Sequence, residues 1–234
     1  MFNDGVKIND THTYDDWELV LTRVSISAPE VKTKKVDVLG RDGMLDLTEA
    51  MSELPKYDNR QIEIELLYRD ADPERWHIQL SEISNYCHGR ECKIIFDSDP
   101  SYYWIGRVSV ESLKDFGASS TYIISVDADP HKYELVGSLE DWLWDPFNFE
   151  TDVIREYRDI KINGATQVSI IATGVPVNLV IIASAPMILS WGNTDYRLVK
   201  GKNILYDILL YEGEGVFKVT GNGTISIDYR GKKL

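Results

Sequence analysis

The sequence is poor in the features on which many small secreted, membrane-bound and metal-binding proteins depend. It has 2 cysteines among 234 residues, too few for a disulfide framework or an all-cysteine metal site. No stretch approaches the roughly 20 apolar residues that a membrane span requires, and residues 1–10 lack the basic and apolar segments of a secretion signal. We therefore expect a protein made in the cytoplasm, without membrane insertion, whose stability comes from packing.

Positive charge is also scarce. Lys and Arg number 25 against 38 Asp and Glu, which gives a formal net charge of −13. Proteins that bind nucleic acid tightly do so with clustered Lys and Arg, which release counterions from the phosphates. The composition therefore argues against a protein that grips DNA, although a negative surface would let DNA pass without binding it.

Catalytic motifs are missing as well. The sequence has no G-x-S-x-G, H-E-x-x-H or glycine-rich phosphate loop, and His12, His77 and His131 stand in unrelated contexts. With 38 acidic residues, some carboxylate pair will lie at glycosidase distance in almost any fold, so their abundance does not indicate a hydrolase. We expect no enzymatic activity and no cofactor.

A short cluster of sulfur and imidazole side chains lies at 87–92. Cys87, His88 and Cys92 resemble part of a metal site, but no second cysteine pair or spaced histidine pair completes four ligands. We interpret the segment as a helix end, where His88 suits the negative end of the helix dipole and Gly89 lets the chain turn.

What the sequence does contain is a pattern of strands. Four segments of the first half alternate apolar and polar residues, the period of a half-buried strand: 17–26, 60–69, 103–113 and 121–129. The first half is therefore predicted to be mostly antiparallel sheet.

One segment of the first half has the helical period instead. Trp76, Leu80, Ile83 and Cys87 form one stripe, Asp72 is a suitable N-cap, and Pro73 stands at the first helical position. We predict a helix over 73–88 that buries its stripe against the sheet.

The second half begins after an acidic, aromatic stretch. Residues 138–152 have neither period and contain Trp142, Trp144, Phe147 and Phe149. These aromatic residues form either a sugar-stacking platform or anchors that dock one domain on another, and we favour docking. Short strands separated by Gly, Asn, Pro or Asp follow to the end, as in a small β-sandwich or barrel. The predicted domains are residues 1–137 and 158–234, joined by 138–157.

The stretch 96–108 pairs Asp97 with Asp99 and raises the question of a calcium site. A calcium loop of the helix-loop-helix type needs Gly at position six and Glu at position twelve, but these positions are Tyr102 and Val108. Asp99 and Pro100 between two strand-like segments favour a chain reversal instead.

Several stretches together resemble the distal tail protein (Dit) family of siphophages. They are the G-x-x-G-x-x-D turn within 36–51, a strand opened by Arg60 after Tyr57, the segment 85–108, the segment 127–133 and the C-terminal 215–234. Ser98 interrupts the paired aspartates of the family pattern, and His131 stands where an aromatic residue is common. The residues that carry the motif are Gly40, Gly43, Asp46, Arg60, Gly89, Asp97, Asp99, Pro100, Tyr102, Gly106 and Arg107.

The resemblance implies a mainly β protein with an N-terminal β-sandwich, one flanking helix and a C-terminal galectin-like β-sandwich. It further implies a hexameric ring at the distal tail tip of the virion, made in the bacterial host cytoplasm. The implied partners are other copies of the chain, the tail tube protein, a tail-tip, tail-associated lysin or fibre protein, and receptor-binding proteins, with DNA passing through the ring. A ring needs head-to-tail contacts, and segments 17–39 and 101–129 are predicted to offer free strand edges for them.

Two other functions stay open at this point. A carbohydrate-binding module for cell-wall adsorption is suggested by the galectin-like half, with Trp191, Asn193, Asp195 and Arg197 as the compact group of possible sugar contacts. A turn at Gly192 explains this group more simply. A wall hydrolase is the weakest alternative, because no site supports it.

Overall fold

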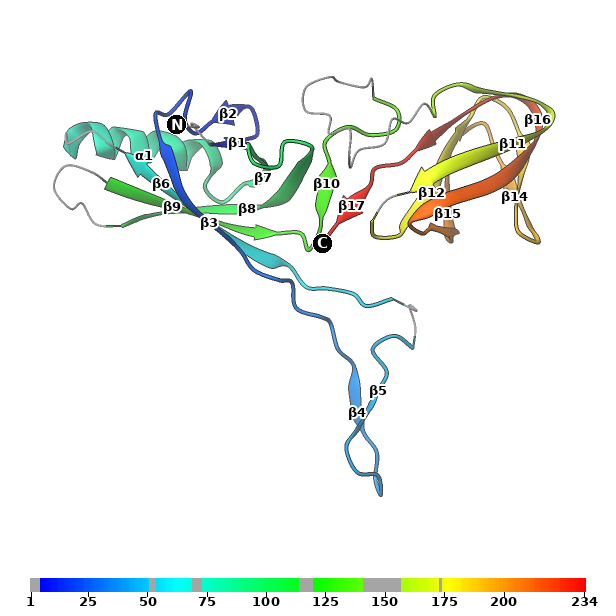
Figure 1. Cartoon of the computed structure of the whole chain (residues 1–234), viewed down its shortest axis with the longest axis horizontal. Coiled ribbons are helices and arrows are strands. Elements are labelled where there is room, and N and C mark those ends of the chain that lie inside the picture. Colours follow the sequence, from blue (N-terminus) through cyan, green and yellow to red (C-terminus); the bar gives the residue numbers. More distant parts are fainter. Residues whose placement is uncertain (1–4, 51–53, 69–72, 114–119, 141–156, 173) are drawn as a thin grey trace. The chain divides into compact units, whose positions relative to one another are not determined.

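The computed structural model describes residues 5–50, 54–68, 73–113, 120–140, 157–172 and 174–234 (Figure 1). It contains two compact units. The first comprises Met1–Asp99 and Tyr103–Pro130, and the second comprises Pro100–Tyr102 and His131–Leu234. The domain ranges expected from the sequence stay a prediction, because most of the connection lies outside the described residues.

The first unit is an antiparallel sheet with a helix on it and a small separate ribbon. Its strands are β1 (Val6–Ile8), β2 (Thr11–His12), β3 (Val20–Ile26), β4 (Lys35–Asp37), β5 (Met44–Asp46), β6 (Arg60–Tyr68), β7 (Glu91–Phe96), β8 (Tyr102–Leu113) and β9 (Ser120–Ala128). The sheet runs in the order β2-β1-β7-β8-β9-β6-β3, and β4 pairs with β5 alone.

Alternation along the strands builds the core of this sheet. In β6, Ile62, Ile64 and Leu66 are fully buried, while the residues between them face outward. The same alternation in β8 and β9 buries Val108 and Ile124. The prediction of antiparallel sheet in the first half is therefore confirmed.

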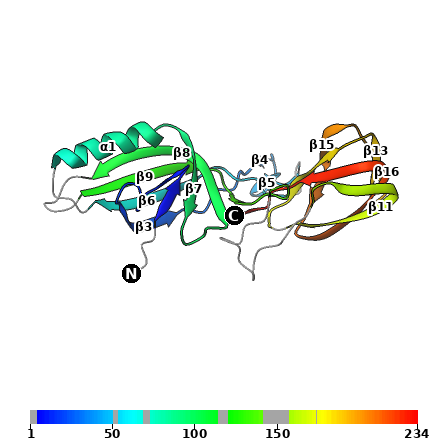
Figure 2. The same cartoon turned by 90° about the horizontal axis from the view of Figure 1, so that it is seen from above.

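Helix α1 (Pro73–Cys87) lies along the strands β6, β8 and β9 (Figures 1 and 2). Ile83 and Cys87 are fully buried, whereas Trp76 and Leu80 are half-buried against the same core. The Trp76 ring stacks on Tyr122 at 6.2 Å between centroids, and the Tyr122 hydroxyl donates to the Trp76 carbonyl oxygen (3.1 Å). The predicted helix is confirmed; its proposed N-cap, Asp72, lies outside the described residues.

The sheet topology corrects one prediction about free edges. Segment 17–39 does supply an edge strand, β3, which pairs only with β6. In segment 101–129, β9 has no free edge because it pairs with β8 and with β6. Strand β8 pairs with β7 only over Trp104–Arg107, so its end at Leu113 has a strand on one side alone. Alternation shows which face of a strand is buried but not whether its edges are paired, so the expectation was wrong for β9.

The second unit is built almost entirely from strands. They are β10 (Lys132–Glu134), β11 (Ile160–Ala172), β12 (Val177–Ala183), β13 (Met187–Trp191), β14 (Thr194–Leu198), β15 (Gly201–Leu210), β16 (Gly213–Asp228) and β17 (Lys232–Lys233). Six of them form a sheet in the order β14-β13-β16-β12-β15, with β11 on β16, and β10 pairs with β17. The prediction of a mainly β chain with one helix is confirmed for the described residues.

Strands β11 and β16 run through positions where turns were predicted. They pair from Ile160–Ile225 to Ala172–Gly213 without a break. Gly221 and Gly223 have φ of 152° and 145°, and a Cβ on either would lie 2.8 Å or less from a neighbouring side-chain atom. These glycines let β16 pair with β13 before them and with β12 after them, so they bend the strand and do not end it.

Candidate functional site: an exposed arm and the motif residues

The most unusual feature of the first unit is an arm, described over residues 27–50 and 54–59, that continues β3 and β6 away from the sheet (Figure 1). At its base the Ser27 N–H donates to the Gln61 carbonyl oxygen (3.0 Å), and the Gln61 N–H donates to Ser27 Oγ (2.9 Å). Farther out, the Asp58 N–H donates to the Glu30 carbonyl oxygen (2.8 Å). The base of the arm is therefore an extension of the ladder between β3 and β6, and the separate ribbon β4–β5 lies beyond it.

The distal half of the arm is shaped by the G-x-x-G-x-x-D motif. Gly40 and Gly43 have φ of 82° and 74°, the left-handed region that favours glycine, and they form the tip. Asp46 accepts hydrogen bonds from the Thr48 hydroxyl and the Thr48 N–H, and these bonds lower the pKa of its carboxyl group. Thr48 Oγ1 in turn accepts from the Lys34 N–H across the ribbon (3.0 Å), so the motif holds the arm in register.

Apolar side chains along the arm face solvent. Leu39 at the tip is fully exposed, and the others are 38–62% exposed: Val31, Val36, Val38, Met44 and Leu47. An isolated two-stranded ribbon has no second layer in which to bury such residues. Exposed apolar groups gathered on one element are typical of an interaction surface.

The Asp97 turn is a structural element that also holds Gly5, just before β1, and His12 of β2. The Asp99 N–H donates to the Phe96 carbonyl oxygen (2.9 Å), which closes the reversal between β7 and β8. Asp97 Oδ2 accepts from the Gly5 N–H (2.7 Å) and lies 3.1 Å from His12 Nε2. Asp97 is thus engaged by groups far away in sequence.

After Pro100 the chain enters the second unit with a buried aromatic residue. Tyr102 is 6% exposed, and its ring lies beneath Lys132 Nζ (4.4 Å) and Lys233 Nζ (4.9 Å). These cation–π contacts hold Tyr102 beside the pair β10–β17. The aromatic residue therefore has a packing role.

Gly89 follows the C-terminal end of α1 and is contacted there by Arg107. Gly89 has φ of 73°, and Arg107 Nη1 donates to its carbonyl oxygen (2.6 Å). His88 Nδ1 accepts from the Val110 N–H (3.0 Å). Burial raises the pKa of the Cys87 thiol to about 12, which leaves it protonated at neutral pH.

Gly106 and Arg60 belong to one cross-strand row. Arg60 lies opposite Ala128, and Ala128 lies opposite Gly106. A Cβ at Gly106 would come within 2.6 Å of the Ala128 Cα and of the Asp127 carbonyl oxygen. The guanidinium of Arg60 stacks on Trp104, 4.7 Å from the ring centroid.

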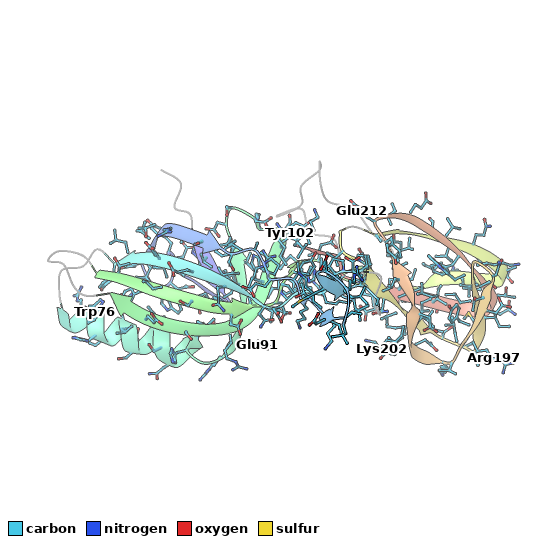
Figure 3. All side chains as sticks on the ribbon, turned by 90° about the horizontal axis from the view of Figure 1, so that it is seen from below. Trp76, Glu91, Tyr102, Arg197, Lys202 and Glu212 are labelled. Carbon is cyan, nitrogen blue, oxygen red and sulfur yellow. The ribbon has the colours of Figure 1, made fainter. Side chains whose placement is uncertain are left out.

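The four possible sugar contacts are not brought to one face. Trp191 lies opposite Thr194, whereas Ser190 lies opposite Asp195, so Trp191 projects from the other side of the ribbon than Asp195. Trp191 packs against Phe217, and Asp195 accepts from Ser190 Oγ (2.6 Å). Asn193 and Arg197 are exposed, Arg197 on the outside of the unit (Figure 3).

The expected aromatic anchors Trp142, Trp144, Phe147 and Phe149 lie outside the described residues. Within the described ranges, no three His, Cys, Asp or Glu side chains are grouped so as to hold a metal ion. No helix among these residues has both the length and the apolar character needed to cross a bilayer.

Sequence reasoning missed the arm itself and the burial of Arg60. The sequence did contain a signal for the arm. Apolar residues stand on both sides of the Gly40–Gly43 turn, and no other predicted element was available to cover them. The alternation of β6 does place Arg60 on the same face as Ile62 and Ile64, but an arginine at the end of a strand is usually exposed, so its burial was not predicted.

Comparison with solved structures identifies the fold. The chain superimposes on the crystal structure of the SPP1 Dit protein (gp 19.1), with a TM-score of 0.64 at 15% sequence identity. The match covers 97% of this chain and 98% of that chain. The chain has the fold of a Dit protein. The predicted resemblance is thereby confirmed at the level of the fold.

The SPP1 Dit protein is described as a paradigm of the hub adsorption apparatus in phages that infect Gram-positive bacteria. Searches against protein families and against curated proteins found no match for this sequence. The Dit likeness therefore rests on the shared fold together with the short motifs.

Proposed function

We propose that the chain is a structural subunit of a phage tail, and that it forms a hexameric ring at the distal end of the tail. The observation that carries the proposal is the Dit fold, which extends over nearly the whole length of both chains. The ring joins the tail tube to the tail tip or baseplate and to the adhesion apparatus. It has no catalytic role.

The arm supplies a contact between neighbouring copies in this ring. Its apolar side chains, above all Leu39, have no cover within the described chain, and burial against a neighbour removes them from water. Strand β3, which leads into the arm, is also the edge strand of the sheet and pairs only with β6. A contact through a projecting element is heterologous, as a closed ring with cyclic symmetry requires.

The negative charge suits the channel of such a ring. A formal net charge of −13 repels a polyanion, so DNA passes through without specific binding. The remaining partners are the tail tube protein, a tail-tip, tail-associated lysin or fibre protein, and receptor-binding proteins. The second unit is a galectin-like β-sandwich that binds protein.

A carbohydrate-binding role has weaker support. Sugar recognition needs an exposed aromatic ring beside convergent polar groups. Trp191 and Asp195 project from opposite sides of their ribbon, so this platform is not assembled. A glycan array with the full chain tests the alternative, and specific binding that is lost in Trp191→Ala would favour it over a purely structural second unit.

Mass photometry and negative-stain imaging of the full chain over a range of concentrations test the ring. We expect six-subunit particles with a central opening, and we expect Leu39→Asp to abolish them without lowering the melting temperature. Ile78→Asp is the matched control, because Ile78 is 60% exposed on the outer face of α1, away from the arm. A chain that stays monomeric at every concentration, or rings that persist in Leu39→Asp, would contradict the proposed arm contact.

A further inference from the structure

Arg60 is a buried cation without a counter-charge. It is 7% exposed, its buried Nε has no hydrogen-bond partner, and the described residues place no carboxylate against it. Burial alone lowers the pKa of its guanidinium, with no opposing contribution from a neighbouring acid. Buried charges in proteins are normally paired, because desolvation of an unpaired ion costs several kcal/mol.

The sheet is built to accept this side chain. Arg60 has the inward orientation of Ile62 in the alternation of β6, and it forms the last pair of the β6–β9 ladder with Ala128. Ala128 and Gly106 are the small residues of the same row, so a long side chain from Arg60 can cross them to Trp104. Stacking on Trp104 stabilises the charge only in part, because it leaves the buried Nε–H without an acceptor.

Other arginines of the chain show which acceptors a guanidinium group usually has. Arg23 forms an ion pair with Glu65 (3.2 Å), and Arg107 donates to a backbone carbonyl oxygen. Arg230 donates to two backbone carbonyl oxygens and pairs with Glu140. Among these described arginines, Arg60 is the one held in a buried position without an oxygen acceptor.

We infer that Arg60 is a receptor for a carboxylate side chain of a neighbouring copy of this chain, and this inference rests on the proposed ring. Three observations favour that occupant. The planar guanidinium fork fits a carboxylate with two parallel hydrogen bonds. The chain is rich in carboxylate acceptors, with 38 Asp and Glu. Arg60 is also the first residue of β6 after the arm returns, so the receptor adjoins the surface already proposed to contact the neighbour.

The test compares Arg60→Met with Arg60→Lys and with Arg90→Met in the full chain. Arg90 is exposed in the turn after α1, so Arg90→Met removes the same charge from the surface of the same unit. Each variant is measured for melting temperature at low concentration and for ring assembly by mass photometry. Because Arg60 is uncompensated in the single chain, Arg60→Met should melt at or above the wild-type temperature.

Ring assembly should respond in the opposite direction. Arg60→Met should weaken association by roughly thirtyfold or more, as when one partner of a buried charge pair is removed. Arg60→Lys should fall between, since it keeps the charge but loses the fork, and Arg90→Met should assemble normally.

Two results would overturn the carboxylate receptor while leaving the ring intact. One is wild-type assembly of Arg60→Met; the other is unfolding of Arg60→Met, which would show that Arg60 supports its own chain. Failure of the wild-type chain to form rings would instead overturn the ring, and the receptor with it.

Discussion

Replacement of Gly106 by alanine is the most direct test of how tightly the central strands pack. The added Cβ would lie 2.6 Å from the Ala128 Cα, the Asp127 carbonyl oxygen and the Val126 Cγ1. Comfortable contacts between carbon atoms need roughly 3.5–4.0 Å. Two of the three atoms belong to the backbone of β9, so the strands must separate locally.

The expected cost is about 3 kcal/mol, the upper part of the range for overpacking in a core. For a unit of this size such a loss corresponds to a melting temperature lower by roughly 10 °C. Differential scanning calorimetry of the full chain is the suitable assay, because two compact units can unfold in separate transitions. Only the transition of the first unit should move.

Gly89→Ala is the matched control. Gly89 has φ of 73° and open space around its Cβ position, so alanine there costs only the left-handed backbone strain, about 1–2 kcal/mol. If Gly106→Ala lowers the melting temperature no more than Gly89→Ala, or if it shifts the second transition instead, the close approach of β8 and β9 is not what requires glycine.

Three further predictions concern the first unit. Trp76→Ala should lower the free energy of unfolding of this unit by about 3 kcal/mol in denaturant titrations. This is the low end of the range for a large aromatic residue, because Trp76 is only half-buried. A change near zero would show that the apolar stripe of the helix does not pack on the sheet. Burial raises the pKa of Cys87 to about 12 from an ordinary value of 9. The free energy of unfolding should therefore be unaffected by this thiol below pH 9 and should fall by about 1.4 kcal/mol per pH unit as pH rises toward 12. Cys87→Ser should flatten this decline, and an equal decline in both proteins would refute the assignment. Asp97→Ala should cost roughly 1–3 kcal/mol and speed hydrogen exchange at the Gly5 amide, which loses its acceptor; unchanged exchange there would contradict the contact.

The local elements could be predicted from the sequence because they depend on short-range pattern. Alternation identified β6, β8 and β9, the helical stripe identified α1, and Asp99 with Pro100 identified the reversal before β8. Each of these signals is complete within about 15 residues, so no knowledge of distant partners was required.

The features that were missed or mistaken depend on distant partners. The two ends of β16 pair with different strands, which only the assembled sheet reveals, so glycines that were expected to separate short strands, Gly221 and Gly223, lie inside one strand. The free edge expected for β9 was wrong for the same reason. The contacts of Asp97 with Gly5 and His12 join residues 85 or more positions apart, which no local motif encodes.

The continuity between the arm and the sheet also has a mechanical consequence. The base of the arm continues β3 and β6, and β6 is hydrogen-bonded on its other side to β9 along its whole length. A pull directed along this base therefore loads the ladder hydrogen bonds in shear, many at once. A hairpin attached at right angles would instead be peeled off bond by bond. The sheet of the first unit should accordingly resist force that is transmitted to the base of the arm.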